Sequence, residues 1–162
     1  MIDAHSFLKD KLKAEKRKHH DAKTLYEHLS NVEKILRICD CDESVCLAGL
    51  FHSIYGTEFY KNKPTDDRKL IKEIIGERAE KLVWIFCNAK RPFCWFFGQV
   101  IPLKDGSFVR VDNKMMKDLH MIEGANLLEQ HDGLHEIVAF SSWQESPADI
   151  SVARKIIDVP EA

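Results

Sequence analysis

The fold is decided by residues 25–53, which read LYEHLSNVEKILRICDCDESVCLAGLFHS. In the first half, apolar residues recur with the period of an amphipathic helix, at Leu25, Leu29, Val32, Ile35 and Leu36. The second half, from Val45 to Phe51, is apolar on most sides, which is typical of a helix at the centre of a domain. We expect Asp21 to cap the first helix, Asp42 or Glu43 to open the second, and the second to end near Gly56.

The flanking sequence predicts further helices and one hairpin. A helix is expected over residues 2–16, and a longer segment from Asp66 is expected to break at Gly76. Two apolar strands flank Asp105-Gly106, which is a hairpin signal, near residues 99–111. Later helices are expected over residues 114–130, 134–143 and 147–157. We therefore predict a single all-α domain over residues 1–162, with roughly six to eight helices and one small β-hairpin.

The composition excludes several classes of protein. The 162 residues are 44% hydrophobic and 31% charged, which suits one ordinary globular core, and the net charge of −2 lacks the basic footprint of a nucleic-acid-binding protein. No apolar stretch approaches the length of a membrane span, and the N-terminus has no signal pattern. The five cysteines then indicate reduced thiols. We expect a cytoplasmic protein with neither a nucleic acid nor a membrane as its partner.

One local run near the N-terminus is basic. It contains Lys9, Lys11, Lys13, Lys16, Arg17 and Lys18 and is followed by His19 and His20. Such a run is usually a solvated helix face, and here it is interrupted by acidic residues. The alternative is a cationic rim beside a pocket that binds an anion.

Two histidines stand out by their surroundings. His28 lies within the first long helix of the quoted stretch, and His52 ends the apolar run of the second. Each alone is more simply explained as a core histidine satisfied by one hydrogen bond, because a buried polar group needs a partner. Facing each other from adjacent helices, however, the two rings could form the nitrogen half of a metal site.

The segment from His28 to Val83 resembles the hydrolase domain of the RelA/SpoT enzymes, which belong to the HD superfamily. That family has a histidine followed by valine and Ile-Leu, matched here by His28, Val32 and Ile35-Leu36, and then an apolar helix ending in His-Asp, matched at His52 without a gap. The later Ala-Asp of the family falls on Ala125-Asn126. The resemblance implies an HD-type helical bundle in which His28, His52 and Asn126 hold a divalent metal such as Mn, Fe or Zn.

A closer resemblance is to a small uncharacterised HD-like family marked by Phe-His-Ser-x-Tyr-Gly-Thr. Residues 51–57, FHSIYGT, fit that signature, and so does His20 placed ahead of His28.

The departures from the RelA/SpoT pattern concern charge. HD enzymes hold their metal with two histidines and two aspartates, but here Ser53 and Asn126 stand where the aspartates are expected. The catalytic Glu-Asp pair of RelA/SpoT is replaced by Gly56-Thr57. The replacements at Ser53 and Asn126 are neutral and weaken the hold on a divalent cation. The carboxylates that could restore the charge are Glu58, which is the catalytic candidate, Glu123 and Asp118.

Three functions remain compatible with the sequence. The missing aspartates favour an HD-like domain with a degenerate metal site, which binds a small anionic or phosphorylated ligand with weak or no hydrolase activity. The alternative is an active metal-dependent phosphohydrolase that acts on a nucleotide or a related small molecule. Retention of both histidines argues against the third function, a purely structural interaction domain. The residues expected to bind the ligand are His20, Lys16, Arg17, Tyr55 and Arg68. The alternative for Arg68 is an ion pair with Asp66 and Asp67, which precede it.

Overall fold

The computed structural model describes residues 1–13, 23–57, 60–91 and 99–130, and within them it is an all-α domain of six helices with one small hairpin, as predicted. The elements in chain order are α1 (Ala4–Leu12), α2 (Leu25–Ile38), α3 (Glu43–Phe51), α4 (Arg68–Ile75), α5 (Glu77–Asn88), β1 (Val100–Pro102), β2 (Phe108–Arg110) and α6 (Asn113–Glu129).

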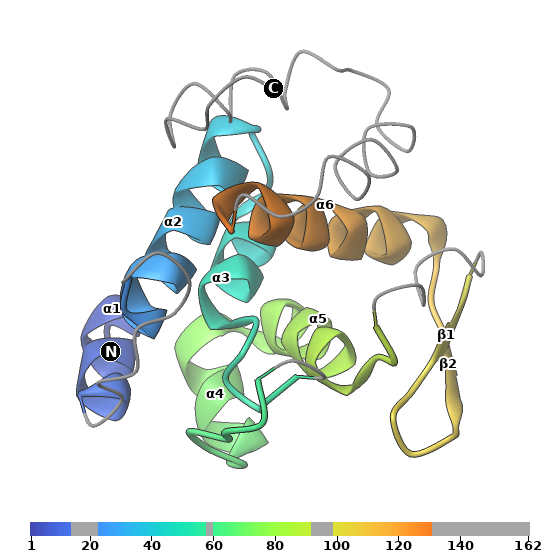
Figure 1. The fold of residues 1–162 in the computed structure, drawn as a ribbon, viewed down its shortest axis with the longest axis horizontal. Helices are drawn as coiled ribbons and strands as arrows, with labels where there is room; N and C mark the ends of the chain where they lie inside the picture. Colours follow the sequence, from blue (N-terminus) through green and yellow to red (C-terminus); the bar gives the residue numbers. More distant parts are fainter. Residues whose placement is uncertain (14–22, 58–59, 92–98, 131–162) are drawn as a thin grey trace.

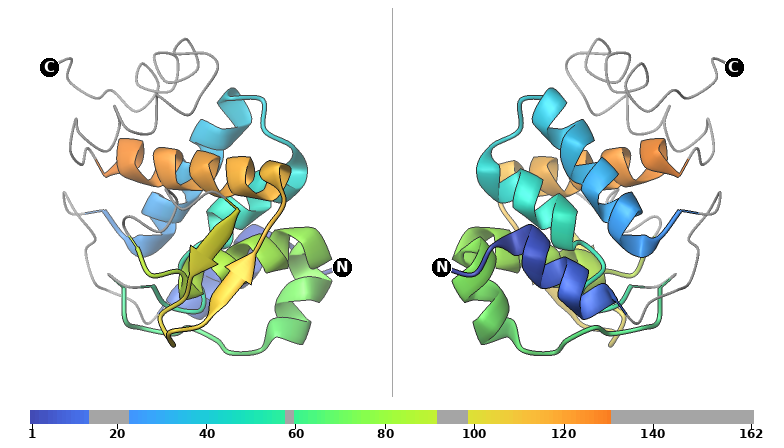
Figure 2. Two further views of the ribbon diagram at one scale, coloured as in Figure 1. Left: turned by 90° about the vertical axis from the view of Figure 1, so that its right-hand side faces the viewer. Right: turned by 90° about the vertical axis from the view of Figure 1, so that its left-hand side faces the viewer.

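Helix α3 is the centre of the fold. It packs against α2, α5 and α6, and α6 crosses over the bundle while α1 and the hairpin lie at opposite ends (Figures 1 and 2). Six of the nine residues of α3 are buried, as expected of a helix that is apolar on most sides. The α2–α3 pair therefore carries both histidines into the core.

Helix α2 begins later than the sequence suggested. Thr24, and not Asp21, is its N-cap, and Asp21 lies outside the described residues. The Thr24 hydroxyl accepts a hydrogen bond from the backbone N–H of Glu27, and the Glu27 carboxylate accepts one from the backbone N–H of Thr24. This capping box satisfies two N–H groups of the first turn at once, which explains why the helix starts here.

The second helix of the pair is shorter than predicted. Asp42 caps α3 as expected, but the helix ends at Phe51, with His52 as its C-cap, and does not reach Gly56. Gly56 instead takes a positive φ of 79° in the turn that follows. The predicted break at Gly76 is confirmed, because φ is 88° there and separates α4 from α5.

The hairpin is found where it was expected. Ile101 pairs with Val109 in antiparallel register, and Gly106 adopts a φ of 87° in the connecting turn. The helices predicted over residues 134–143 and 147–157 lie outside the described residues. Among the helices that are described, none has both the length and the apolar character that a membrane crossing requires.

Candidate metal centre

The packing of α2 on α3 brings His28 and His52 together in the core. A Cβ atom at Gly49 would lie only 2.2 Å from Cδ1 of Leu36, so the glycine permits the close approach of the two helices. The two imidazole rings are 1% and 2% exposed, and their Nε2 atoms lie 3.3 Å apart. The expectation that the rings face each other from adjacent helices is confirmed.

Each ring is held at its other nitrogen. Nδ1 of His52 lies 2.7 Å from the backbone oxygen of Gly49, which can only accept, so His52 donates there. Nδ1 of His28 forms a short contact with the carboxylate of Glu129. Burial alone would raise the pKa of Glu129, but the hydrogen bond and the positive charge of a protonated His28, together with hydrogen bonds from Lys23 and Asn31, lower the pKa. A carboxylate oxygen that is ionised can only accept, so Nδ1 of His28 is the donor in this contact.

The positions of these hydrogens have a direct consequence for the two Nε2 atoms. A neutral imidazole has one N–H, so a ring that donates from Nδ1 presents a lone pair at Nε2. Two such lone pairs 3.3 Å apart in a buried site repel each other unless a cation lies between them. A shared proton or a metal ion meets this need. Two nitrogens bound tetrahedrally to one zinc ion are themselves about 3.3 Å apart, so the pair fits a divalent cation.

Asn126 and Ser53 are buried, but both are neutral and bring no negative charge to this centre. Asn126 donates to Glu123 at 3.4 Å and accepts from Gln130 at 3.3 Å, and within the described residues no hydrogen bond joins it to a histidine. No group of three or more His, Cys, Asp and Glu side chains arranged to hold a metal occurs in residues 1–13, 23–57, 60–91 and 99–130. Within the part of the chain that the structure describes, the ring nitrogens that approach each other at this centre are Nε2 of His28 and Nε2 of His52.

The carboxylates proposed as replacements are engaged elsewhere. Arg91 binds Glu123 through both of its oxygens, at 2.8 and 3.0 Å, in a buried ion pair. Asp118 pairs with Arg78 and Lys114. Glu58 lies outside the described residues. Among the described carboxylates, Glu129 is the one that contacts His28, and sequence reasoning missed it.

A signal for Glu129 was present in the sequence. It follows Asn126 by three residues, which places both on one face of α6. A carboxylate one helical turn after Asn126 can supply the missing negative charge through His28, without binding the ion itself.

The other residues predicted to bind a ligand form a separate cluster or lie outside the described residues. The hydroxyl of Tyr55 donates to Glu80 at 3.0 Å, and Arg68 donates to the same carboxylate at 2.6 and 2.9 Å. Arg68 also stacks over Trp84, at 4.9 Å from the ring centroid. The suggestion that Arg68 pairs with its neighbours Asp66 and Asp67 is therefore wrong. Lys16, Arg17 and His20 are not among the described residues.

Three of the described cysteines, Cys41, Cys46 and Cys87, are free thiols. Burial raises the pKa of Cys41 and of Cys87 to about 12, and that of Cys46 to about 11. Such thiols are protonated near neutral pH and are poor metal ligands and nucleophiles.

Comparison with solved structures supports the HD-like fold. The chain matches a structure titled "A metazoan ortholog of SpoT hydrolyzes ppGpp and plays a role in starvation responses", with a TM-score of 0.55 and 15% sequence identity over 95% of this chain and 90% of that one. At this level of identity the likeness concerns the fold alone. No curated protein matches the sequence.

A family model described as "Domain of unknown function (DUF6817)" matches residues 8–91, which include both His28 and His52. The match spans more than half of the 162 residues. The chain therefore belongs to the DUF6817 family.

Proposed function

We propose that this chain is a single HD-like domain that binds a divalent metal ion between His28 and His52 and a small anionic ligand, such as a nucleotide or another phosphorylated compound, beside that ion. In this proposal the domain has weak or no hydrolase activity. The observation that carries it is the pair of buried Nε2 atoms, 3.3 Å apart, whose rings both donate from Nδ1.

The anionic ligand follows from charge and coordination. Among the described residues, two buried carboxylates of α6 already have their own cations, Glu129 with Lys23 and Glu123 with Arg91. A divalent ion added to this balanced set leaves a local positive charge, which attracts an anion in a site largely shielded from water. Two imidazoles also leave coordination positions for the oxygens of a ligand. When bound, the ion would supply a Lewis acid for such oxygens.

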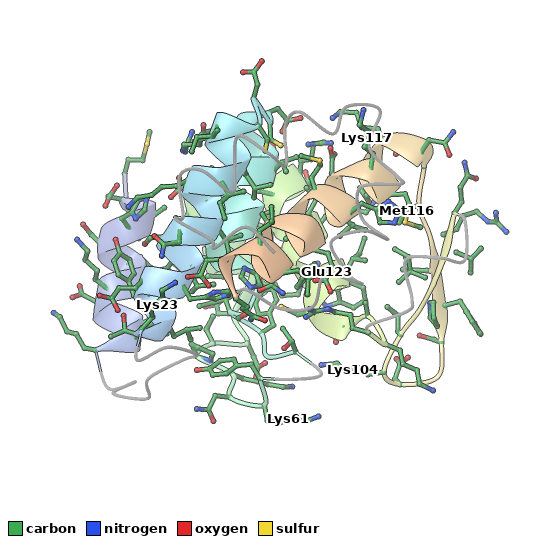
Figure 3. The ribbon with its side chains drawn as sticks, turned by 45° about the horizontal axis from the view of Figure 1, so that its top comes forward. Lys23, Lys61, Lys104, Met116, Lys117 and Glu123 are labelled. Atoms are coloured by element: carbon green, nitrogen blue, oxygen red, sulfur yellow. The ribbon has the colours of Figure 1, made fainter. Side chains whose placement is uncertain are left out.

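Lys23 suits a place at the edge of such a site. Its ammonium group lies 3.0 Å from Glu129, and its side chain is 30% exposed. Figure 3 shows Lys23 beside the C-terminal end of α6, with Glu123 farther along that helix. A partly exposed ammonium group in this position can contact a phosphate that approaches from solvent.

Calorimetric titration of metal-free protein with Zn²⁺ tests the metal site. We expect one equivalent of Zn²⁺ to bind. We expect His28→Ala and His52→Ala each to weaken Zn²⁺ binding more than about a hundred-fold, because losing a direct ligand should cost more than losing a supporting partner, for which about a hundred-fold is the upper end. His5→Ala is the control, because His5 bonds to Tyr26 and Glu33 on the α1–α2 face. Binding that is absent in the wild type, or unchanged in His52→Ala, would contradict the proposal.

The anion site is tested with inorganic pyrophosphate, with and without saturating Zn²⁺. If bound Zn²⁺ strengthens the binding of pyrophosphate, bound pyrophosphate must strengthen the binding of Zn²⁺ by the same factor. We expect pyrophosphate to bind at least about five-fold more tightly with Zn²⁺ present, the lower end of common coupling. Equal affinities in the two conditions would remove the anion from the proposal and leave the metal site standing.

A further inference from the structure

We infer that Glu129 is a positioning residue for the two-histidine centre, which holds His28 in the tautomer that directs a lone pair at the cation. This inference rests on the proposed metal function. It assigns to α6 a supporting carboxylate that lies one contact away from the ion, whereas HD enzymes have an aspartate bound to the ion itself.

The contacts of Glu129 are those of a fixed acceptor. Its side chain is 2% exposed and receives three donors on two oxygens. Lys23 lies at 3.0 Å and Asn31 at 3.2 Å from Oε1, and the Nδ1 atom of His28 contacts Oε2. Because Lys23 and Asn31 occupy Oε1, the carboxylate cannot easily rotate away from His28. The three donors come from the start of α2 and the segment before it, so Glu129 also links α6 to α2.

The effect on His28 follows from the chemistry of imidazole. Metal-binding histidines usually donate their second N–H to a carboxylate or a carbonyl group, which fixes the tautomer and raises the basicity of the coordinating nitrogen. Here the carboxylate of Glu129 does this for His28 and the carbonyl of Gly49 does it for His52. Without Glu129 the neutral ring of His28 could carry its hydrogen on Nε2, where it would block the cation.

Glu129 also supplies part of the negative charge that HD enzymes obtain from their two metal-binding aspartates. Ser53 and Asn126 are neutral where HD enzymes have aspartates, and Glu123 and Asp118 are paired with arginines. Glu129 is the carboxylate that contacts the histidine pair within the described residues. A charge one residue removed from the ion still offsets the cost of placing a cation in the core.

The test compares Glu129→Gln with Glu33→Gln. Both changes remove one buried, ion-paired carboxylate, but Glu33 pairs with Arg37 and His5 and does not contact His28. We expect Glu129→Gln to weaken Zn²⁺ binding about 10- to 100-fold, which is the usual effect of removing a supporting partner of a metal-bound histidine. We expect Glu33→Gln to change Zn²⁺ binding by less than about two-fold, because Glu33 does not support His28 or His52.

A second readout needs no metal. Nitrogen-15 NMR of histidine-labelled, metal-free protein reports which ring nitrogen carries the hydrogen. We expect His28 to carry it on Nδ1 in the wild type and in Glu33→Gln, and to gain the Nε2–H form in Glu129→Gln. Far-ultraviolet circular dichroism establishes that each variant is folded. If Glu129→Gln does not fold, Glu129→Asp, which keeps the charge but shortens its reach, should give a smaller loss of the same kind.

The outcomes separate this inference from the metal proposal. If the wild type binds no Zn²⁺, the metal proposal fails, and the NMR result still decides whether Glu129 sets the tautomer. If the wild type binds Zn²⁺ through both histidines but Glu129→Gln binds it equally well with an unchanged His28 tautomer, the inference about Glu129 alone is overturned.

Discussion

Purified protein supplied with guanosine tetraphosphate and Mn²⁺ is expected to show little or no release of pyrophosphate. In the resemblance to the RelA/SpoT hydrolases, Gly56 and Thr57 fall where those enzymes have their catalytic Glu-Asp pair, and neither residue can accept a proton near neutral pH. Loss of a general base alone typically costs about 10²- to 10⁴-fold in rate. Weaker metal binding, from a centre with two imidazoles and no aspartate, would add to that loss.

A coupled assay for pyrophosphate measures this directly. The opposite result would be turnover near about 1 s⁻¹, the lower end of ordinary enzyme rates, which disappears in His52→Ala. That result would mean that another carboxylate completes a catalytic site, and Glu58 would be the first candidate to test.

Restoring aspartate at both Ser53 and Asn126 examines the family alignment. Both residues are buried, at 6% and 3% exposure, and Ser53 directly follows His52. If both replace metal-binding aspartates, the double substitution should raise the affinity for Mn²⁺, because carboxylate oxygens suit this ion. Unchanged Mn²⁺ binding would show that Asn126 does not correspond to the second aspartate.

Phe51→Ala is expected to lower the free energy of unfolding by about 3–5 kcal/mol. Phe51 is fully buried in α3, the central helix, and stacks on Phe7 of α1 with 6.3 Å between ring centroids. Truncation removes apolar contacts and leaves a cavity that a close-packed core fills only in part. A loss of this size is a large fraction of the stability of an ordinary domain.

Urea unfolding of the wild type, Phe51→Leu and Phe51→Ala measures the effect. The leucine variant keeps most of the buried volume and should lose clearly less stability than the alanine variant. Because Phe51 precedes His52 in the chain, folded Phe51→Ala protein should also bind Zn²⁺ less tightly. A cost below about 1 kcal/mol for Phe51→Ala, which is ordinary for a surface site, would contradict the central position of α3.

The pattern of apolar residues predicted the bundle well because burial requires it. The apolar residues from Leu25 to Leu36 and the apolar run up to Phe51 are removed from water when the two segments form helices that pack on each other. Helix ends were less predictable. Thr24 and Glu27 carry the capping-box signature, yet Asp21 was an equally good cap by residue type, and only the chain geometry decides between them.

The site was predictable only in part for a different reason. The spacing of His28 and His52 could be read from the sequence, since both lie on apolar helices that must pack. The partners of the buried charges could not, because an ion pair such as Arg68 with Glu80 or Arg91 with Glu123 depends on how separate elements meet. The same holds for Glu129, which lies 101 residues after His28.

The central claim is that His28 and His52 share one cation-binding centre. The most direct measurement is a crystal of the protein grown with Zn²⁺ and diffracted at the zinc absorption edge, with an anomalous difference map. The account predicts one strong peak at about 2.0–2.1 Å from Nε2 of both histidines, with Glu129 still bonded to Nδ1 of His28. A map with no peak between the two rings, or with the strong peak at another site, would contradict the account.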